Sequence, residues 1–267
     1  MSDMATRINL GTIGVHYVAG ELTPQAAAVV ERLGYTAVWI AGTREAHLTI
    51  AERVLAATET LAAATGVVNI WHINARVADT YHRLKAAYPG RFRAIGAGHR
   101  RAPGRLPLPI PGAGRLPGRA GRRGVPKQRR ALAALGPKVL KLAAERSAGA
   151  YPFLVIPAYT ARARELLDPD ALLAAEHQVA LGEPISTRAA GRQAIQVHLR
   201  LANYRASLTR LGFGEHDLDD RRSNALDDAL VAQGDAATAA KQLHTQLAAA
   251  PHTQSYMRCP ARTGRAS

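Results

Sequence analysis

The feature that most constrains the fold is a regular alternation of strand-like and helix-like segments along most of the chain. Strand signals occur at residues 8–18, 36–40, 66–71, 92–98, 131–135, 151–156 and 172–181. Helical periods occur at residues 24–33, 48–64, 75–87, 137–148 and 158–167, and residues 186–248 are mostly helical with breaks at Gly212 and Gly234. Repeated units of this length imply a parallel sheet with right-handed crossovers. Seven such strands favour an α/β fold of the closed (β/α)8 barrel type over an open doubly wound sheet.

Length and composition fit one barrel domain over residues 1–250. The chain has 267 residues and is 47% hydrophobic, which excludes a disordered protein. No apolar run approaches the roughly 18 residues of a membrane span, and the N-terminal residues lack the apolar core of a signal peptide. Cys259 is the single cysteine, so no disulfide framework forms. We therefore expect a cytoplasmic protein without a membrane partner.

The formal net charge of +15 comes mainly from two segments. Residues 100–123 contain seven arginines and no acid, and residues 251–267 contain three arginines and no acid. Together they supply ten of the fifteen charges, so the basic character is mostly local. These arginines lack interleaved aromatic residues for base stacking, so we expect no specific nucleic-acid partner. Nonspecific, salt-dependent polyanion binding through the basic segment stays an alternative.

The same two segments interrupt the alternating pattern. Residues 100–124 have no hydrophobic period and contain five prolines and six glycines. The irregular tail, residues 251–267, lacks the strand expected to close the barrel. The sequence thus predicts an imperfect barrel, disrupted after its fourth strand and at its last strand.

Residues 131–149 contain the clearest candidate for ligand binding. A short apolar run ends at Leu135, and Gly136, Pro137 and Lys138 lead directly into a helical period. The free N–H groups at a helix N-terminus, together with the helix dipole, form an anion site. Proline suits the first helical position, and glycine allows a phosphate to approach the backbone. An ordinary strand–helix corner is the competing interpretation.

Several longer runs resemble the luciferase-like flavin and deazaflavin oxidoreductases, in particular a short actinobacterial subfamily linked to coenzyme F-420. About three-quarters of the chain matches, in the same order. The matching runs are 10–15 (LGTIGV), 33–40 (LGYTAVWI), 64–71 (ATGVVNIW), 87–92 (AYPGRF), 95–99 (IGAGH), 131–149 and 203–213 (NYRASLTRLGF). The resemblance implies an oxidoreductase that moves a hydride between reduced coenzyme F-420 and an organic small-molecule substrate. A monooxygenase that uses flavin mononucleotide (FMN) is the near alternative, and a homodimer is possible.

The resemblance also implies positions for the coenzyme at the carboxyl ends of the strands. The turn Leu135–Lys138, which includes Gly136 and Pro137, would hold its phosphate side chain. A backbone bulge at Val67, Val68 and Asn69 would support the ring, although both valines also suit a core. The other implied coenzyme-binding positions are Trp71, Gly96 and Gly98.

Two histidines are candidates for proton transfer. His16 and His99 lie at strand ends, where a histidine can donate a proton or bond to the ring. A solvated or purely structural histidine is the alternative at both positions. Some relatives carry an acid followed by histidine after the second strand, but this chain has Ala41, Gly42 and Thr43 there. No pair of histidines has HxxxH or HExxH spacing, so we expect no metal.

The departures from the family pattern suggest a further alternative. Where residues 100–124 stand, the family has an amphipathic helix. Back-translation of residues 106–124 with GC-rich codons, moved by one nucleotide, can produce a peptide with apolar residues at helical spacing. Residues 251–259 similarly become strand-like. The chain could therefore be a frame-damaged, inactive relative.

Overall fold

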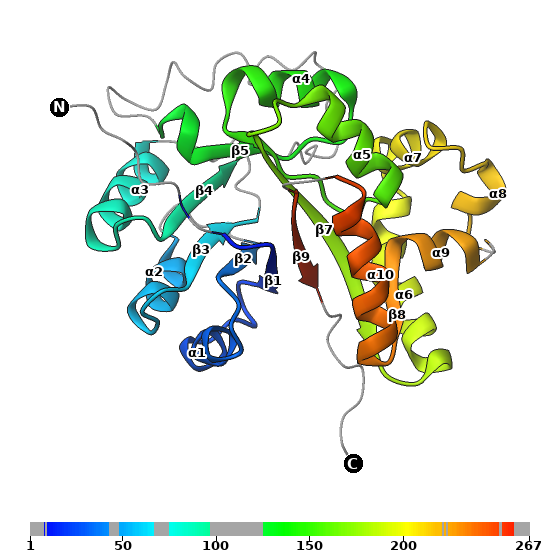
Figure 1. The fold of residues 1–267 in the computed structure, drawn as a ribbon, viewed down its shortest axis with the longest axis horizontal. Coiled ribbons are helices and arrows are strands. Elements are labelled where there is room, and N and C mark those ends of the chain that lie inside the picture. Colours follow the sequence, from blue (N-terminus) through cyan, green and yellow to red (C-terminus); the bar gives the residue numbers. More distant parts are fainter. Residues whose placement is uncertain are drawn as a thin grey trace.

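The computed structural model describes residues 8, 10–42, 48–66, 75–96, 125–220, 222, 224–250 and 253–258. Strands and helices alternate through most of these ranges (Figure 1). The strands are β1 (Ile13–Val18), β2 (Ala37–Ala41), β3 (Ala62–Thr65), β4 (Phe92–Gly96), β5 (Arg130–Leu132), β6 (Gly149–Ala150), β7 (Leu172–Leu181), β8 (Val231–Gly234) and β9 (Thr253–Arg258). The helices are α1 (Pro24–Arg32), α2 (Thr49–Ala56), α3 (Ala75–Ala87), the 3-10 helix η1 (Lys127–Arg129), α4 (Pro137–Arg146), α5 (Pro157–Leu166), α6 (Pro184–Leu199), α7 (Ala202–Thr209), α8 (Glu215–Leu218), α9 (Asn224–Leu230) and α10 (Ala236–Ala248).

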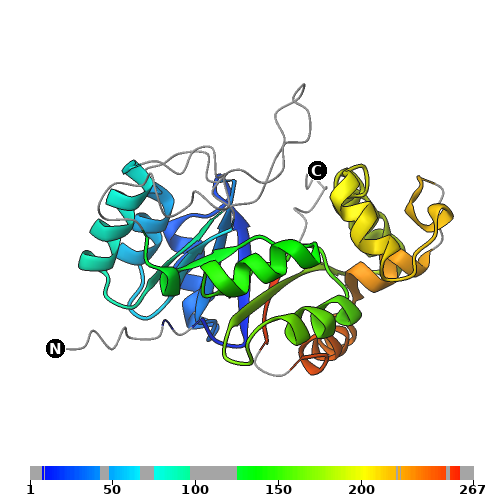
Figure 2. The same cartoon turned by 90° about the horizontal axis from the view of Figure 1, so that it is seen from above.

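Eight of these strands pair in a cyclic order, which confirms the (β/α)8 type of fold. All pairings are parallel, and they run from β1 through β2, β3, β4, β5, β6 and β7 to β9, which pairs with β1 again. The ten-residue β7 extends past the ring, where residues 178–181 pair with β8. Helices α6–α9, coloured yellow to orange, gather at one side of the barrel in Figure 2.

The ends of the elements follow the local sequence signals. Thr23 caps α1 by accepting a hydrogen bond from the Ala26 N–H, as the Thr23-Pro24 pair predicts. Helices α4, α5 and α6 also begin with a proline, which needs no hydrogen-bond partner at the first helical position. Strands β5 and β6 are shorter than the predicted runs 131–135 and 151–156, and both begin earlier.

The prediction for the third strand was wrong in position. The helical period at residues 48–64 splits into α2 and β3, and β3 covers Ala62–Thr65 instead of starting at Gly66. Alanine favours a helix where tertiary packing does not determine the conformation. In β3 the alanines have the small side chains that fit a strand buried on both faces. Burial therefore outweighed helix propensity.

The turn before β3 is held by a carboxylate from another element. Glu31 in the last turn of α1 accepts N–H groups of Glu59, Thr60 and Leu61, and also the Thr60 hydroxyl. Burial alone would raise the pKa of Glu31, but these hydrogen bonds outweigh it and lower the pKa to about 2. Glu31 thus fixes the place where α2 gives way to β3.

The last strand also differs from the prediction. Residues 253–258, expected to be part of an irregular tail, form β9 and pair with both β1 and β7. Backbone groups supply these hydrogen bonds, so the sequence TQSYMR can form the strand without the apolar pattern that the prediction required. The basic segment at residues 100–124 lies outside the described residues.

Replacing Glu31 with glutamine is expected to lower the free energy of unfolding by about 1 kcal/mol at pH 7, because a charged acceptor becomes neutral and solvent screens the site. The carboxylate has a lowered pKa in the folded protein, so its contribution is present above about pH 4.5 and disappears as the pH falls toward 2. Urea unfolding of both proteins at pH 7 and near pH 3 measures this difference. A difference that does not shrink at low pH would contradict the assignment.

Candidate functional site

The amino-terminal half of the barrel interior is filled by apolar side chains. Trp39 stacks on Tyr151, with ring centroids 5.0 Å apart and an interplanar angle of 25°. The remaining buried members of this cluster are Ile8, Leu10, Ala37, Ala62, Ala64, Ala131 and Ala174. These residues form a packed apolar cluster, and in this fold active sites lie at the carboxyl ends of the strands, so the candidate site is sought there.

Polar side chains replace apolar ones toward those carboxyl ends. His16 of β1 pairs in register with Trp39, and paired residues of parallel strands face the same side, so His16 points into the barrel. On β7, Ala174 belongs to the inner cluster, and alternation places Glu176 and Gln178 on the same inner face. All three polar residues are buried, with exposed fractions of 4%, 0% and 1%.

Glu176 fixes the segment that follows β6. One of its carboxylate oxygens accepts the Leu154 N–H at 2.9 Å, and the other accepts the Gln178 side-chain amide. Leu154 has a φ of +55°, a left-handed conformation that is unfavourable for a leucine. The buried hydrogen bond from Glu176 therefore holds an irregular backbone at the barrel rim.

This segment brings aromatic rings over the barrel mouth. The Phe153 ring centroid lies 6.1 Å from that of His16 and 5.0 Å from that of His198 at the end of α6. His198 in turn meets Tyr204 of α7 edge-on, at 5.2 Å. The rings connect the inner histidine of β1 with the helices that follow β7, so these helices border the mouth beside His16.

The predicted anion site lies at the N-terminus of α4. Gly136 is the N-cap, no side chain caps this helix end, and Pro137 is its first residue. The Val139 and Leu140 N–H groups both donate to the Gly136 carbonyl, and within the described ranges the Lys138 N–H has no partner. Among the described residues, a Cβ on Gly136 would meet no atom within 4 Å, so this backbone is open on that side to the described part of the chain.

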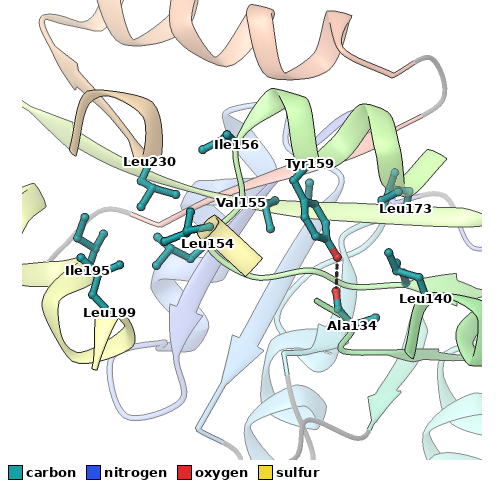
Figure 3. Packing of buried hydrophobic residues seen from close by; sticks show 14 of the residues in the cluster. Ala134, Leu140, Leu154, Val155, Ile156, Tyr159, Leu173, Ile195, Leu199 and Leu230 are labelled. Atoms are coloured by element: carbon teal, nitrogen blue, oxygen red, sulfur yellow. Dashed lines mark hydrogen bonds between the residues drawn. The ribbon is translucent and has the colours of Figure 1, made fainter. Parts of the chain in front are cut away.

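Tyr159 of α5 holds the segment between β5 and this turn. Its hydroxyl donates to the Ala134 carbonyl at 2.7 Å, within the cluster shown in Figure 3. Burial raises the pKa of the Tyr159 hydroxyl above its usual value. The hydroxyl therefore stays protonated and remains a donor at neutral pH.

Some of the predicted site residues lie within the described ranges, and the others lie outside them. His16 lies in the barrel, Gly96 ends β4 opposite Leu132, and Leu135 is half-buried against the core beside α4. β1 and β5 are opposite in a ring of eight strands, so His16 and the Gly136–Lys138 turn flank the mouth from two sides. The predicted residues outside the described ranges are Val67, Val68, Asn69, Trp71, Gly98 and His99.

Glu176 is a buried site residue that the sequence reasoning missed. Its signal was a single acid inside the apolar run LLAAEHQVAL, because an acid is rarely buried in a strand without a specific partner. The described part of the chain contains no group of three or more histidine, cysteine or acidic residues placed to hold a metal ion. No helix in it combines the length and apolar character needed to cross a membrane.

Solved structures share this architecture at low sequence identity. An F-420-dependent secondary alcohol dehydrogenase, in complex with an F-420–acetone adduct, has a TM-score of 0.66 and 15% identity over 96% of this chain and 94% of its own. The coenzyme F-420-dependent tetrahydromethanopterin reductase from Methanopyrus kandleri has a TM-score of 0.67 and 14% identity, covering 94% and 93%. The EDTA monooxygenase from Chelativorans sp. BNC1 has a TM-score of 0.60 and 11% identity, covering 90% and 82%.

The sequence comparisons add no closer relative. No protein-family model matches the chain, and no curated protein matches it. At 11–15% identity, the structural likeness establishes the barrel fold alone.

Replacing Tyr159 with phenylalanine is expected to lower the free energy of unfolding by about 1–2 kcal/mol, because the buried Ala134 carbonyl loses its donor. Tyr35→Phe is the matched control, since its hydroxyl makes no hydrogen bond within the described residues. Urea unfolding measures both variants. Equal stability losses in the two variants would show that the Tyr159 hydroxyl does not hold the turn.

Proposed function

We propose that this chain is an oxidoreductase that binds a phosphate-bearing deazaflavin, coenzyme F-420, at the mouth of the barrel. The supporting observation is the uncapped N-terminus of α4, which opens onto free space at Gly136 at the carboxyl end of β5. In this fold that end of the strands is where active sites lie. The similarity to F-420-dependent enzymes and to monooxygenases adds weight to a redox role.

The residues present fit such a group. The α4 N-terminus offers the Lys138 N–H and a positive dipole to a phosphate, and the exposed Lys138 side chain adds a full charge. His16 faces the interior from the opposite side of the ring, where it can hydrogen-bond a bound ring or transfer a proton. Val67, Val68, Asn69, Trp71, Gly96 and Gly98 remain our proposed contacts to the coenzyme on the basis of the family resemblance. His99 remains, with His16, a proposed candidate for proton transfer.

When bound, the deazaflavin supplies the hydride chemistry, and the protein supplies orientation. The Tyr159–Ala134 hydrogen bond and the Glu176–Leu154 hydrogen bond keep the two sides of the mouth in place. The substrate we propose is a small organic molecule that enters beside Phe153 and the α6–α7 helices. FMN is the alternative coenzyme, because the same helix terminus would hold its phosphate.

The variant Gly136→Asp separates phosphate binding from folding. Aspartate is a favourable N-cap residue, and its charge complements the helix dipole, so stability is expected to stay equal or to rise by a few tenths of a kcal/mol. The same carboxylate repels a phosphate and fills the space beside it, so coenzyme affinity is expected to fall at least tenfold. Fluorescence titrations with F-420 and with FMN, together with thermal unfolding, measure the two effects.

Gln128→Glu is the matched control, because it adds one negative charge at the other end of β5, on the exposed η1. Its coenzyme affinity should stay within about twofold of the original protein, given screening over that distance. An unchanged affinity in Gly136→Asp would exclude α4 as the phosphate site. No binding of either coenzyme to the original chain would refute the proposed function and would favour the inactive, frame-damaged relative.

A further inference from the structure

A pocket lies at the opposite end of the barrel from the proposed coenzyme site. It is next to the amino-terminal ends of β4 and β5, and its cavity volume is about 90 Å³. Tyr81, Tyr88 and Phe92 form aromatic walls, and Lys85 and Arg129 supply positive charge. None of the described residues that line it is acidic.

Arg129 is the residue that distinguishes this pocket. Its exposed fraction is only 8%, and its backbone N–H bonds to the Pro126 carbonyl. Across the ranges that the structure describes, its guanidinium makes no hydrogen bond and no ion pair. The guanidinium nitrogens are not among the fully enclosed unpaired atoms of the described residues, so they face the pocket, where a bound partner can reach them.

Two other arginines close to Arg129 in sequence or in the sheet, Arg91 and Arg130, have hydrogen-bond acceptors within the protein. Arg91 donates to the Leu61 carbonyl and to the Thr58 hydroxyl. Arg130 donates to the carbonyls of Arg146 and Val125. Arg129 instead lines the pocket. The unsatisfied donors of Arg129 therefore belong to the pocket and not to the scaffold.

We propose that this pocket binds the oxyanion of a small molecule, a carboxylate or a phosphate, through the guanidinium of Arg129. The planar guanidinium can bind either oxyanion through two parallel hydrogen bonds. Lys85 at the exposed side adds a second charge, and the aromatic walls exclude water from the ion pair. The volume corresponds to about three water molecules, which suits an acetate, a phosphate or the anionic head of a larger ligand.

The test is a titration of the full chain with sodium phosphate and, separately, with sodium acetate at constant ionic strength. The Nε–H resonance of Arg129, assigned by its loss in Arg129→Gln, gives a local readout that binding at α4 does not supply. We expect a saturable shift with a Kd on the order of 1 mM, typical of a small ion in a partly open site. Comparable affinities would identify a general oxyanion site, and a clear preference for phosphate would identify a phosphate site.

Variants separate the pocket from general charge effects. The Gly136→Asp variant removes the proposed α4 contribution, because its carboxylate repels an anion there. In that background, Arg129→Gln is expected to lose the remaining saturable binding, as measured by calorimetric titration. Lys127→Gln removes the same charge from the exposed η1 and should keep the Kd within about twofold. The proposal is overturned if the original chain shows no saturable shift with either anion, or if Arg129→Gln binds as well as Lys127→Gln.

Discussion

The barrel depends on fitting the Trp39 side chain inside the ring of strands. Its indole stacks on Tyr151, and it fits only because Gly14 on the adjacent strand has no side chain. A Cβ on Gly14 would lie 2.6 Å from the indole nitrogen, so any other residue would displace the largest side chain of the interior. The two rings and the surrounding alanines share this interior with His16, which is in register with Trp39, and with Glu176, two residues beyond Ala174.

The distribution of charge follows a second constraint. The chain has 35 basic residues and 20 acidic ones, so many arginines cannot pair with an acid. Arg130 donates to the carbonyl of Arg146 at the end of α4, and Arg162 donates to the carbonyl of Arg210 at the end of α7. Cations at these positions satisfy terminal carbonyls and complement the negative end of the helix dipole. These two arginines therefore close the ends of α4 and α7 without an acidic partner.

The sequence predicted the architecture well because alternation, proline at helix starts and glycine at turns are local signals. The Thr23-Pro24 start and the Gly136–Lys138 turn are of this kind. The alanines of β3 carried no such signal, because burial between neighbouring strands determined their conformation. The acid of Glu176 stands out in an apolar run, but its role depends on Leu154, a partner 22 residues earlier in the chain. Likewise, β9 forms through pairing with β1 and β7, contacts that no periodicity within residues 253–258 reveals.

The two anion sites that we propose lie at the two ends of β5 and differ in their chemistry. Arg129 precedes the strand and offers a full, localised charge in a small aromatic pocket. Gly136 follows it and offers backbone N–H groups and a helix dipole, whose effect falls off within the first turn. A guanidinium suits a small, enclosed oxyanion, whereas an open helix terminus suits a phosphate on a ligand that extends across the mouth. The three residues of β5 thus keep the two sites apart, so that an anion at the base of the barrel need not compete with a ligand at its mouth.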